Sequence, residues 1–164
     1  MTLTVDRLKE LLHYEPTTGL FTVIRRRRNQ LQIGDTVGHK VQRGYVSIHI
    51  DGRGYLAHRL AWLYMTGKWP IAEIDHANCD TSDNRIANLR EASRSQNVRN
   101  SRLRCNNHSG YKGVRLHKKT GLWQARITLK GHDQSLGYFR RPEDAHEAYC
   151  KAAVITCGEF ARAA

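Results

Sequence analysis

The chain has 164 residues, of which 40% are apolar, and carries a formal net charge of +12 with a pI near 10.0. This length fits one ordinary domain or two small ones, and the low apolar share predicts small cores. No apolar run reaches the roughly 20 residues that cross a bilayer, and the first six residues lack the pattern of a secretion signal, so we expect an intracellular protein with no membrane partner. The basic excess predicts a polyanionic partner, and it favours nucleic acid over an anionic membrane surface.

The first predicted element is a helix that Thr4 can cap. Its apolar positions have helical spacing and are Val5, Leu8, Leu11 and Leu12. A turn at residues 16–19 ends the helix, and residues 20–24 predict a strand.

The next elements are a strand and a second helix. Residues 44–50 alternate, with Val46, Ile48 and Ile50 on one face, and Asp51-Gly52 predicts a hairpin turn. Residues 56–66 have helical spacing, with Leu56, Leu60, Leu63 and Tyr64 facing inward. Gly67 closes this helix and Pro70 stops it.

Two further sequence features are a run of four arginines and four widely spaced cysteines. The run Arg25-Arg26-Arg27-Arg28 either contacts phosphates or is simply exposed. The four cysteines are far apart and form no C-x-x-C pair, which is typical of free thiols and not of a disulfide framework or a zinc knuckle. They are Cys79, Cys105, Cys150 and Cys157.

Residues 71–100 predict a strand, a loop, a second strand and a helix. Residues 71–76 should be extended, and Ser93 with Gln96 has the spacing of a capping box, so a helix should begin at Ser93. Asn97 then falls in the opening turns of that helix. Its amide could face back toward Asp75 across the preceding hairpin.

This segment brings a carboxylate, an imidazole and several amides close together. Carboxylate and amide oxygens are hard ligands suited to Mg²⁺ or Mn²⁺. A neutral imidazole beside them can take a proton from water near neutral pH. These groups are the components of a phosphodiester hydrolase.

The order of motifs is similar to that of a known family. The chain has Asp75-His76, Asp83-Asn84-Arg85, Asn88-Leu89-Arg90 and Gln96-Asn97, preceded by Ala57-His58-Arg59-Leu60-Ala61-Trp62 and Gly67-Lys68-Trp69-Pro70. This order resembles the HNH endonucleases common in phage and intron homing genes. The resemblance implies a ββα-metal motif that hydrolyses DNA, in which Asp75 and Asn97 ligate one divalent cation, Mg²⁺ or Mn²⁺. His76 would be the general base.

The resemblance also implies supporting roles. Asn88 would brace the loop and orient His76, and the loop would be locked by Asp83, Asn84 and Arg85. Many relatives have glycine where this chain has Cys79. His58 either supports the site, contacts phosphate or packs against its neighbours on the helix surface, and packing is the favoured interpretation. Asn78 and Asp80 are excluded as metal ligands because loops commonly use such residues in turns.

A basic linker is predicted over residues 101–109, and a second small unit follows it. Strands are expected at residues 111–117, 122–130 and 134–139, with a helix over residues 142–153. In the middle strand one face is apolar and should pack, while the other is polar. The apolar face consists of Trp123, Ala125, Ile127 and Leu129.

The second unit resembles the Apetala/ethylene-response-factor DNA-binding domain. The resemblance rests on Tyr111-Lys112-Gly113-Val114-Arg115, Trp123-Gln124-Ala125-Arg126-Ile127, Leu136-Gly137-Tyr138-Phe139 and Glu143-Asp144-Ala145-His146-Glu147-Ala148-Tyr149. That family lays its sheet in the major groove, which implies DNA contacts from Lys112, Arg115, His117, Arg126 and Thr128. Arg115 and Arg126 are the candidates for bidentate guanine contacts. The alternative is that these residues form only the solvated face of a small sheet. Asp133 and Ser135 differ from the base-reading residues of the plant family, so this chain should not recognise the plant target site.

Together these features predict an α+β protein in two parts. Residues 1–100 would form an HNH endonuclease domain with its ββα-metal core at about 71–100, and residues 110–164 would form a three-stranded antiparallel sheet packed on one helix. The predicted function is metal-dependent cleavage of double-stranded DNA, targeted by the second part. The alternatives are a DNA-binding regulator with a vestigial nuclease motif and, less favoured, a structural RNA-binding protein.

The sequence leaves the biological setting open. A monomer should nick DNA and a symmetric dimer could break both strands. A homing, restriction or phage accessory role would each fit, with the protein phage-encoded or in the host cytoplasm or nucleoid.

Overall fold

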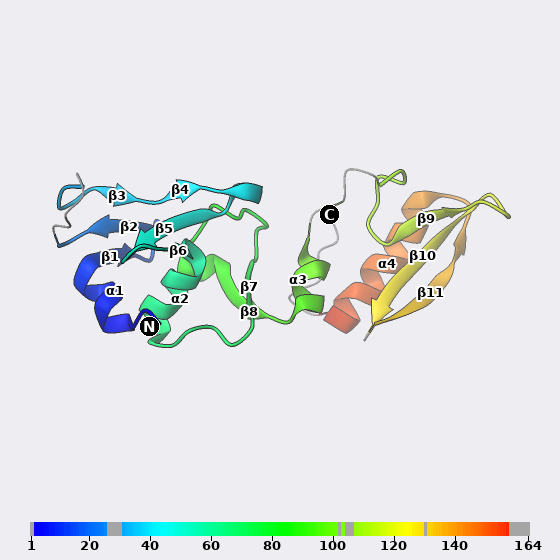
Figure 1. Ribbon diagram of the computed structural model, residues 1–164. Helices are drawn as coiled ribbons and strands as arrows, with labels where there is room; N and C mark the ends of the chain where they lie inside the picture. Colours follow the sequence, from blue (N-terminus) through cyan, green and yellow to red (C-terminus); the bar gives the residue numbers. More distant parts are fainter. Residues whose placement is uncertain (1, 26–30, 102, 104–106, 130, 158–164) are drawn as a thin grey trace. The chain divides into compact units, whose positions relative to one another are not determined.

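The computed structural model describes residues 2–25, 31–101, 103, 107–129 and 131–157. Contacts between Cα atoms divide the chain into two compact units, Met1–Ser93 and Arg94–Ala164. Both units combine helices with small antiparallel sheets (Figure 1). Among the residues described, no helix is both long and apolar enough to cross a bilayer.

The first unit begins with a helix and a hairpin. Helix α1 (Val5–Leu11) is capped as predicted, because the Thr4 hydroxyl accepts a hydrogen bond of 3.2 Å from the Arg7 N–H. Strand β1 (Leu12–Glu15) follows without a break and pairs with β2 (Leu20–Val23), which also pairs with β3 (Thr36–Val37). The prediction missed β1: Leu12 continues the helical stripe in sequence, yet it begins the alternating burial of a strand.

A second sheet leads into helix α2. Its strands are β4 (His39–Lys40), β5 (Val46–Ile50) and β6 (Arg53–Leu56), and the 3₁₀ helix η1 (Gln42–Gly44) joins the first two. The predicted hairpin turn at Asp51-Gly52 is confirmed, with both residues at positive φ. Helix α2 (Ala57–Thr66) ends as predicted at Gly67, which is left-handed and donates its N–H to the Leu63 carbonyl.

The core of the first unit supports the hairpin that carries the predicted site. Its largest fully buried side chains come from α1, both sheets and α2, and are Leu8, Leu12, Tyr14, Phe21, Val23, Ile50, Leu60 and Leu63. Strands β7 (Glu73–His76) and β8 (Leu89–Ala92) form a two-stranded antiparallel sheet, and the 3₁₀ helix η2 (Ile86–Asn88) precedes β8. Ile74 and Leu89 join the core. The hairpin is therefore anchored through its apolar residues.

In the second unit a sheet packs on one helix. Strands β9 (Val114–His117), β10 (Leu122–Leu129) and β11 (His132–Phe139) are antiparallel with β10 central, and α4 (Pro142–Cys157) lies against one face (Figure 1). The predicted apolar face is confirmed, since Ala125 and Ile127 pack with residues of α4. Helix α4 extends one turn beyond the predicted end at residue 153. Ala153, at the predicted end, is buried in the same cluster, whereas Val154 and Ile155 in the added turn are exposed.

Helix α3 (Arg94–Asn100) groups with the second unit. The predicted boundary lay near residue 100, after this helix. Two sets of hydrogen bonds account for the difference: the Lys112 ammonium donates to the carbonyls of Arg99 and Ser101, the latter at 2.8 Å, and the Arg99 guanidinium donates to the Thr128 carbonyl at 3.2 Å. Long-range contacts of this kind leave no local signal in the sequence.

Candidate functional site

The register of the β7–β8 hairpin sets the positions of the two central residues. Asp75 lies opposite Arg90, and His76 lies opposite Leu89. Both Asp75 and His76 are 4% exposed. A carboxylate and an imidazole at such depth require polar partners, because burial of an unsatisfied polar or charged group is costly.

Asp75 has a cationic partner across the hairpin. The Nε and Nη2 atoms of Arg90 each lie 2.9 Å from Oδ2 of Asp75. Arg90 belongs to the motif Asn88-Leu89-Arg90, but the sequence pattern predicted no role for it. The antiparallel register brings the two side chains together.

Asn88 holds the two ends of the loop between β7 and β8. Its Oδ1 accepts a hydrogen bond of 3.0 Å from the Asn78 N–H, and its Nδ2 donates at 2.9 Å to the Asp83 carbonyl. The Asn88 carbonyl also accepts from the Ala77 N–H at 2.9 Å. One residue thus fixes the loop directly after His76.

The predicted lock of this loop by Asp83, Asn84 and Arg85 is confirmed. The Arg85 guanidinium donates to both Asp83 carboxylate oxygens, at 2.8 and 2.6 Å, and the Asn78 amide donates to one of them at 2.7 Å. Arg85 and these other donors lower the pKa of Asp83 to about 2. Asn84 is buried and donates its side-chain amide to the Ser82 carbonyl at 3.0 Å.

Residues far away in sequence anchor the same loop. The Tyr14 hydroxyl donates to the Asn84 carbonyl at 2.7 Å, and burial raises the pKa of Tyr14 to about 12, so the phenol remains a donor. Gly19 has a φ of +74°, and a Cβ there would lie 2.5 Å from the Arg85 nitrogen. The Thr81 hydroxyl donates to the Arg43 carbonyl at 2.7 Å. The loop is therefore held from β1, from the β1–β2 turn and from η1.

Cys79 occupies a conformation that glycine adopts more easily. Its φ is +58°, and its N–H donates to the His76 carbonyl at 2.8 Å. The turn after Asp75-His76 is thus formed with a side chain present. A left-handed non-glycine residue costs roughly 1–2 kcal/mol, which the surrounding loop contacts offset.

His76 is surrounded by opposing influences on its protonation. Burial lowers its pKa, and this effect prevails over the Asn84 side chain and the nearby carboxylates of Asp75, Asp83 and Asp80, which raise it. The imidazole is consequently neutral near neutral pH. A neutral ring has a nitrogen lone pair that can accept a proton.

His58 is not the helix-surface residue that the sequence favoured. It is 5% exposed, in the first turn of α2, and its ring centroid lies 5.0 Å from that of His76 in an edge-on arrangement. Burial first, then His76 and Arg59, lower the pKa of His58 to about 3. The position of α2 on the core carries this histidine inward, and the sequence spacing gave no sign of it.

The predicted metal ligands come from different elements. Asp75 is in β7 of the first unit, directly before the last residue of that strand. Asn97 is a half-buried residue of α3, which groups with the second unit and begins at Arg94, directly after the predicted cap Ser93. Among the described residues no group of three or more His, Cys, Asp or Glu side chains has the arrangement of a metal centre. One carboxylate and one amide oxygen nevertheless suit Mg²⁺, which usually retains several waters and binds substrate phosphates.

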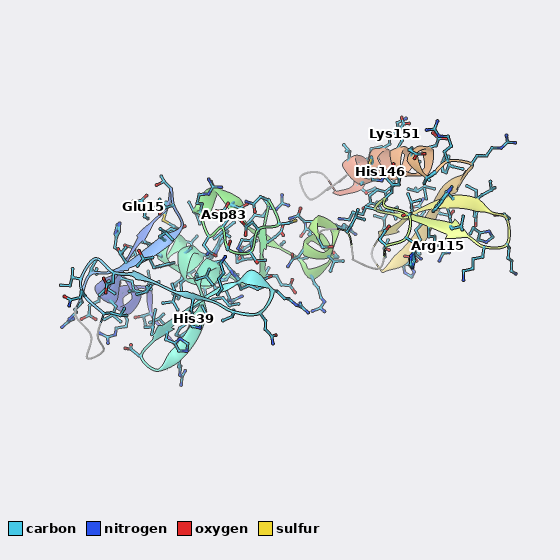
Figure 2. The ribbon with its side chains drawn as sticks, turned by 90° about the horizontal axis from the view of Figure 1, so that it is seen from above. Glu15, His39, Asp83, Arg115, His146 and Lys151 are labelled. Carbon is cyan, nitrogen blue, oxygen red and sulfur yellow. The ribbon has the colours of Figure 1, made fainter. Side chains whose placement is uncertain are left out.

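Four of the five predicted DNA-binding residues share the polar face of the C-terminal sheet. Pairing across the strands puts Arg115 and Arg126 on the side opposite Ala125 and Ile127, together with His117 and Thr128. Figure 2 shows Arg115 on the side of the sheet away from α4, which carries His146 and Lys151. Lys112 lies apart, before β9, where its ammonium donates to the carbonyls of Arg99 and Ser101 at the end of α3.

Hydrogen bonds order this polar face. Gln124, only 7% exposed, accepts from the Arg115 Nε at 2.9 Å and donates to the Ser135 and Tyr138 hydroxyls at 3.0 and 3.1 Å. Asp133 accepts from Arg126 at 2.7 Å and from Thr128 at 2.6 Å. Both arginines are thus held in defined orientations by neighbours on the sheet, a feature that the sequence did not indicate.

Two sequence features lie partly outside the described residues. Arg25 forms an ion pair with Glu10, and the rest of the arginine run, residues 26–28, lies outside the described residues. Cys79 and Cys150 are free thiols as predicted, whereas Cys105 and the side chain of Cys157 also lie outside the described part.

A model of a known protein family matches part of the chain. An HNH endonuclease family model matches residues 55–99, a segment that begins in β6 and ends in α3 and contains Asp75, His76, Asn88 and Asn97. No curated protein and no solved structure gives a significant match. Residues 55–99 are therefore similar to HNH nucleases, which are hydrolases that act on DNA and generally use a divalent metal ion.

Proposed function

We propose that this protein is a metal-dependent endonuclease that cuts double-stranded DNA with residues 71–100 and selects its target with the C-terminal sheet. The observation that carries the proposal is the pair Asp75-His76, buried at the end of β7 beside a loop that is fixed by hydrogen bonds at both ends. The HNH match over the same residues supports the nuclease class. A loop so heavily braced keeps reactive groups in fixed positions, as hydrolysis requires.

His76 is the proposed general base. Burial keeps its imidazole neutral near pH 7, so the ring can remove a proton from a water that attacks the phosphorus. The attack expels the 3′ oxygen in one displacement, and no covalent intermediate is needed. Asn88 has the supporting role, since its hydrogen bonds fix the loop that follows His76.

Asp75 and Asn97 are the proposed ligands of one divalent cation, Mg²⁺ or Mn²⁺. When bound, such a cation neutralises charge that develops on the phosphate and on the leaving oxygen. Asp75 supplies a carboxylate and Asn97 an amide oxygen, both of which are hard donors. Arg90 keeps the Asp75 carboxylate oriented through two contacts to one of its oxygens.

DNA targeting is assigned to the polar face of β9, β10 and β11. Arg115 and Arg126 have guanidinium groups that can read guanine by two hydrogen bonds, and His117 and Thr128 lie on the same face. The net charge of +12 supports electrostatic attraction to the DNA backbone. This arrangement is consistent with the predicted placement of a sheet in the major groove.

Cleavage of supercoiled plasmid and of mixed phage DNA tests the proposal. The purified protein is incubated with Mg²⁺, with Mn²⁺ or with EDTA, beside His76→Ala and the control His39→Ala. His39 is exposed on β4 and stacks on His49. We expect nicked or linear product that requires the metal and His76 but not His39. Product in EDTA, or an active His76→Ala protein, would refute the assignment.

A DNA-binding regulator with a vestigial nuclease motif is the second candidate. The ion pair between Arg90 and Asp75 favours it, because a cation already neutralises the proposed metal ligand. Binding without cleavage on diverse DNA, at any divalent metal concentration, would select the regulator. The form of the product would also show whether one or both strands are cut, and therefore whether a monomer or a dimer acts.

A further inference from the structure

Three rings from separate segments meet in the first unit. The centroid of Tyr45, the residue after η1, lies 5.3 Å from that of His58 and 5.9 Å from that of His76. The His58 and His76 centroids are 5.0 Å apart at an interplanar angle of 81°. The His76 imidazole is therefore in contact with two other rings, which also contact each other.

His58 destabilises the folded state through one of its ring nitrogens. Its Nδ1 atom is buried and has no hydrogen-bond partner among the described residues. A buried polar atom without a partner destabilises a fold, and an apolar side chain would avoid that cost. Such an atom draws attention to this position. The His58 ring contacts the His76 ring, and this contact does not involve a hydrogen bond from Nδ1.

The two neighbours of His76 are rigidly supported. His58 lies in the first turn of α2, where Ala57, Leu60 and Ala61 are buried in the core. Tyr45 follows η1, and the Arg43 carbonyl of η1 accepts the hydrogen bond from Thr81 in the loop after His76. The rings are thus connected to the core on one side and to the loop on the other.

We infer that His58 and Tyr45 are positioning residues that hold the plane of the His76 imidazole and do not touch the substrate. The inference rests on the proposed role of His76 as a general base. Proton removal requires a base within hydrogen-bonding distance and in the right orientation. A neutral His58 also suits this place, because a charged neighbour would oppose protonation of His76 during the reaction.

Substitutions that distinguish the role of the His58 ring from the role of its nitrogen atoms test the inference. His58→Phe retains a flat ring, and His58→Ala removes it. We expect His58→Phe to cut plasmid within about 3-fold of the wild type, and His58→Ala to lose about 100-fold in kcat, the scale of a displacement of roughly 1 Å. KM and DNA affinity should be unchanged in both. Tyr45→Phe and Tyr45→Ala should show the same contrast.

Two kinetic results would overturn the inference. Wild-type kcat in His58→Ala would show that the ring is dispensable. An equal loss in His58→Phe and His58→Ala would show that a nitrogen of His58 acts in the chemistry. Thermal unfolding of each variant in the full chain identifies any protein that has failed to fold.

A readout without cleavage separates this inference from the proposed function. In protein with ¹³C-labelled histidine, the ring signal of His76 should be single and sharp in the wild type and in His58→Phe. It should broaden or split in His58→Ala, because the ring then samples several orientations. A sharp single signal in all three proteins would overturn the inference, even if the wild type does not cut DNA; broadening without any wild-type cleavage would refute only the proposed function.

Discussion

Arg90 contacts one oxygen of Asp75 with two of its nitrogens, each at 2.9 Å, across the β7–β8 pair. The carboxylate is 4% exposed, whereas the Arg90 side chain is 20% exposed. The partly exposed cation therefore neutralises the deeply buried anion. This pair connects the stability of the hairpin to the proposed metal site.

Removal of Arg90 should destabilise the protein and make it more responsive to metal. Arg90→Ala leaves a buried carboxylate without this partner, which costs about 3 kcal/mol. A divalent cation that binds Asp75 would recover part of the loss, so Mg²⁺ should raise the Tm of Arg90→Ala more than that of the wild type. Thermal unfolding with and without Mg²⁺ measures this.

Arg126→Ala is the control for that experiment. Its ion pair with Asp133 is exposed, so the variant should lose less than about 1 kcal/mol and show no added response to Mg²⁺. An Arg90→Ala protein as stable as the wild type would contradict the structural role assigned to this pair.

Stability should fall in acid because of His58. Its pKa is about 3 in the folded protein against 6.5 ordinarily, so the unfolded chain binds the additional proton between these values. Stability therefore decreases as the pH falls from 6.5 toward 3, by up to about 1.4 kcal/mol per pH unit from this residue. His58→Phe should flatten the dependence, as urea unfolding at several pH values would show.

His39→Phe provides the comparison, since His39 is exposed. This variant should keep the wild-type pH dependence of unfolding. A His58→Phe protein with an unchanged acid dependence would mean that other groups dominate in this pH window.

A side chain at Gly19 should displace the loop of the proposed active site. Gly19 and Gly52 have similar positive φ values, +74° and +78°. A Cβ at Gly19 would meet the backbone of Asn84 and Arg85, whereas a Cβ at Gly52 has nothing within 4 Å. Gly52→Ala should cost about 1 kcal/mol from the backbone alone, and Gly19→Ala should cost clearly more and lower cleavage.

Comparison of the two glycine variants measures the effect of the close approach between Gly19 and the backbone of Asn84 and Arg85. Both are compared by thermal unfolding and by plasmid cleavage at a temperature where each is folded. Equal destabilisation and equal cleavage in the two variants would show that the approach of Gly19 to the loop affects neither stability nor cleavage.

Arg115→Ala should weaken specific DNA binding by about 1–3 kcal/mol if the polar face of the sheet reads bases. The matched control is Lys151→Ala on α4, which removes a positive charge on the opposite side of the unit. Fluorescence anisotropy with a selected target and a scrambled duplex distinguishes site choice from general affinity. Equal losses for the two variants on both duplexes would argue for charge alone.

Lys112→Ala distinguishes two roles for a residue that the sequence assigned to DNA contact. Its hydrogen bonds to the carbonyls of Arg99 and Ser101 predict a loss of stability in the second unit. Affinity for DNA should change less than in Arg115→Ala. A large loss of affinity with unchanged stability would support the predicted DNA contact of Lys112.

Local pattern was sufficient for much of this protein. The Thr4 cap, the Asp51-Gly52 turn, the Gly67 helix end and the apolar face of β10 depend on neighbours in sequence, and each was predicted correctly. The lock by Asp83 and Arg85 is likewise made by residues two positions apart. Short-range hydrogen bonds and side-chain periodicity are written directly in the order of residues.

The support of the site comes from long-range contacts. Tyr14 reaches Asn84 across 70 positions, His58 is turned into the core beside His76, and Lys112 bonds to the end of α3 instead of joining the sheet face. These relationships depend on which buried surfaces pack together, and packing is a property of the whole unit. The order of residues supplies the groups that could perform the chemistry. The fold sets which of these groups are held rigid, because only long-range contacts can fix a side chain from several directions.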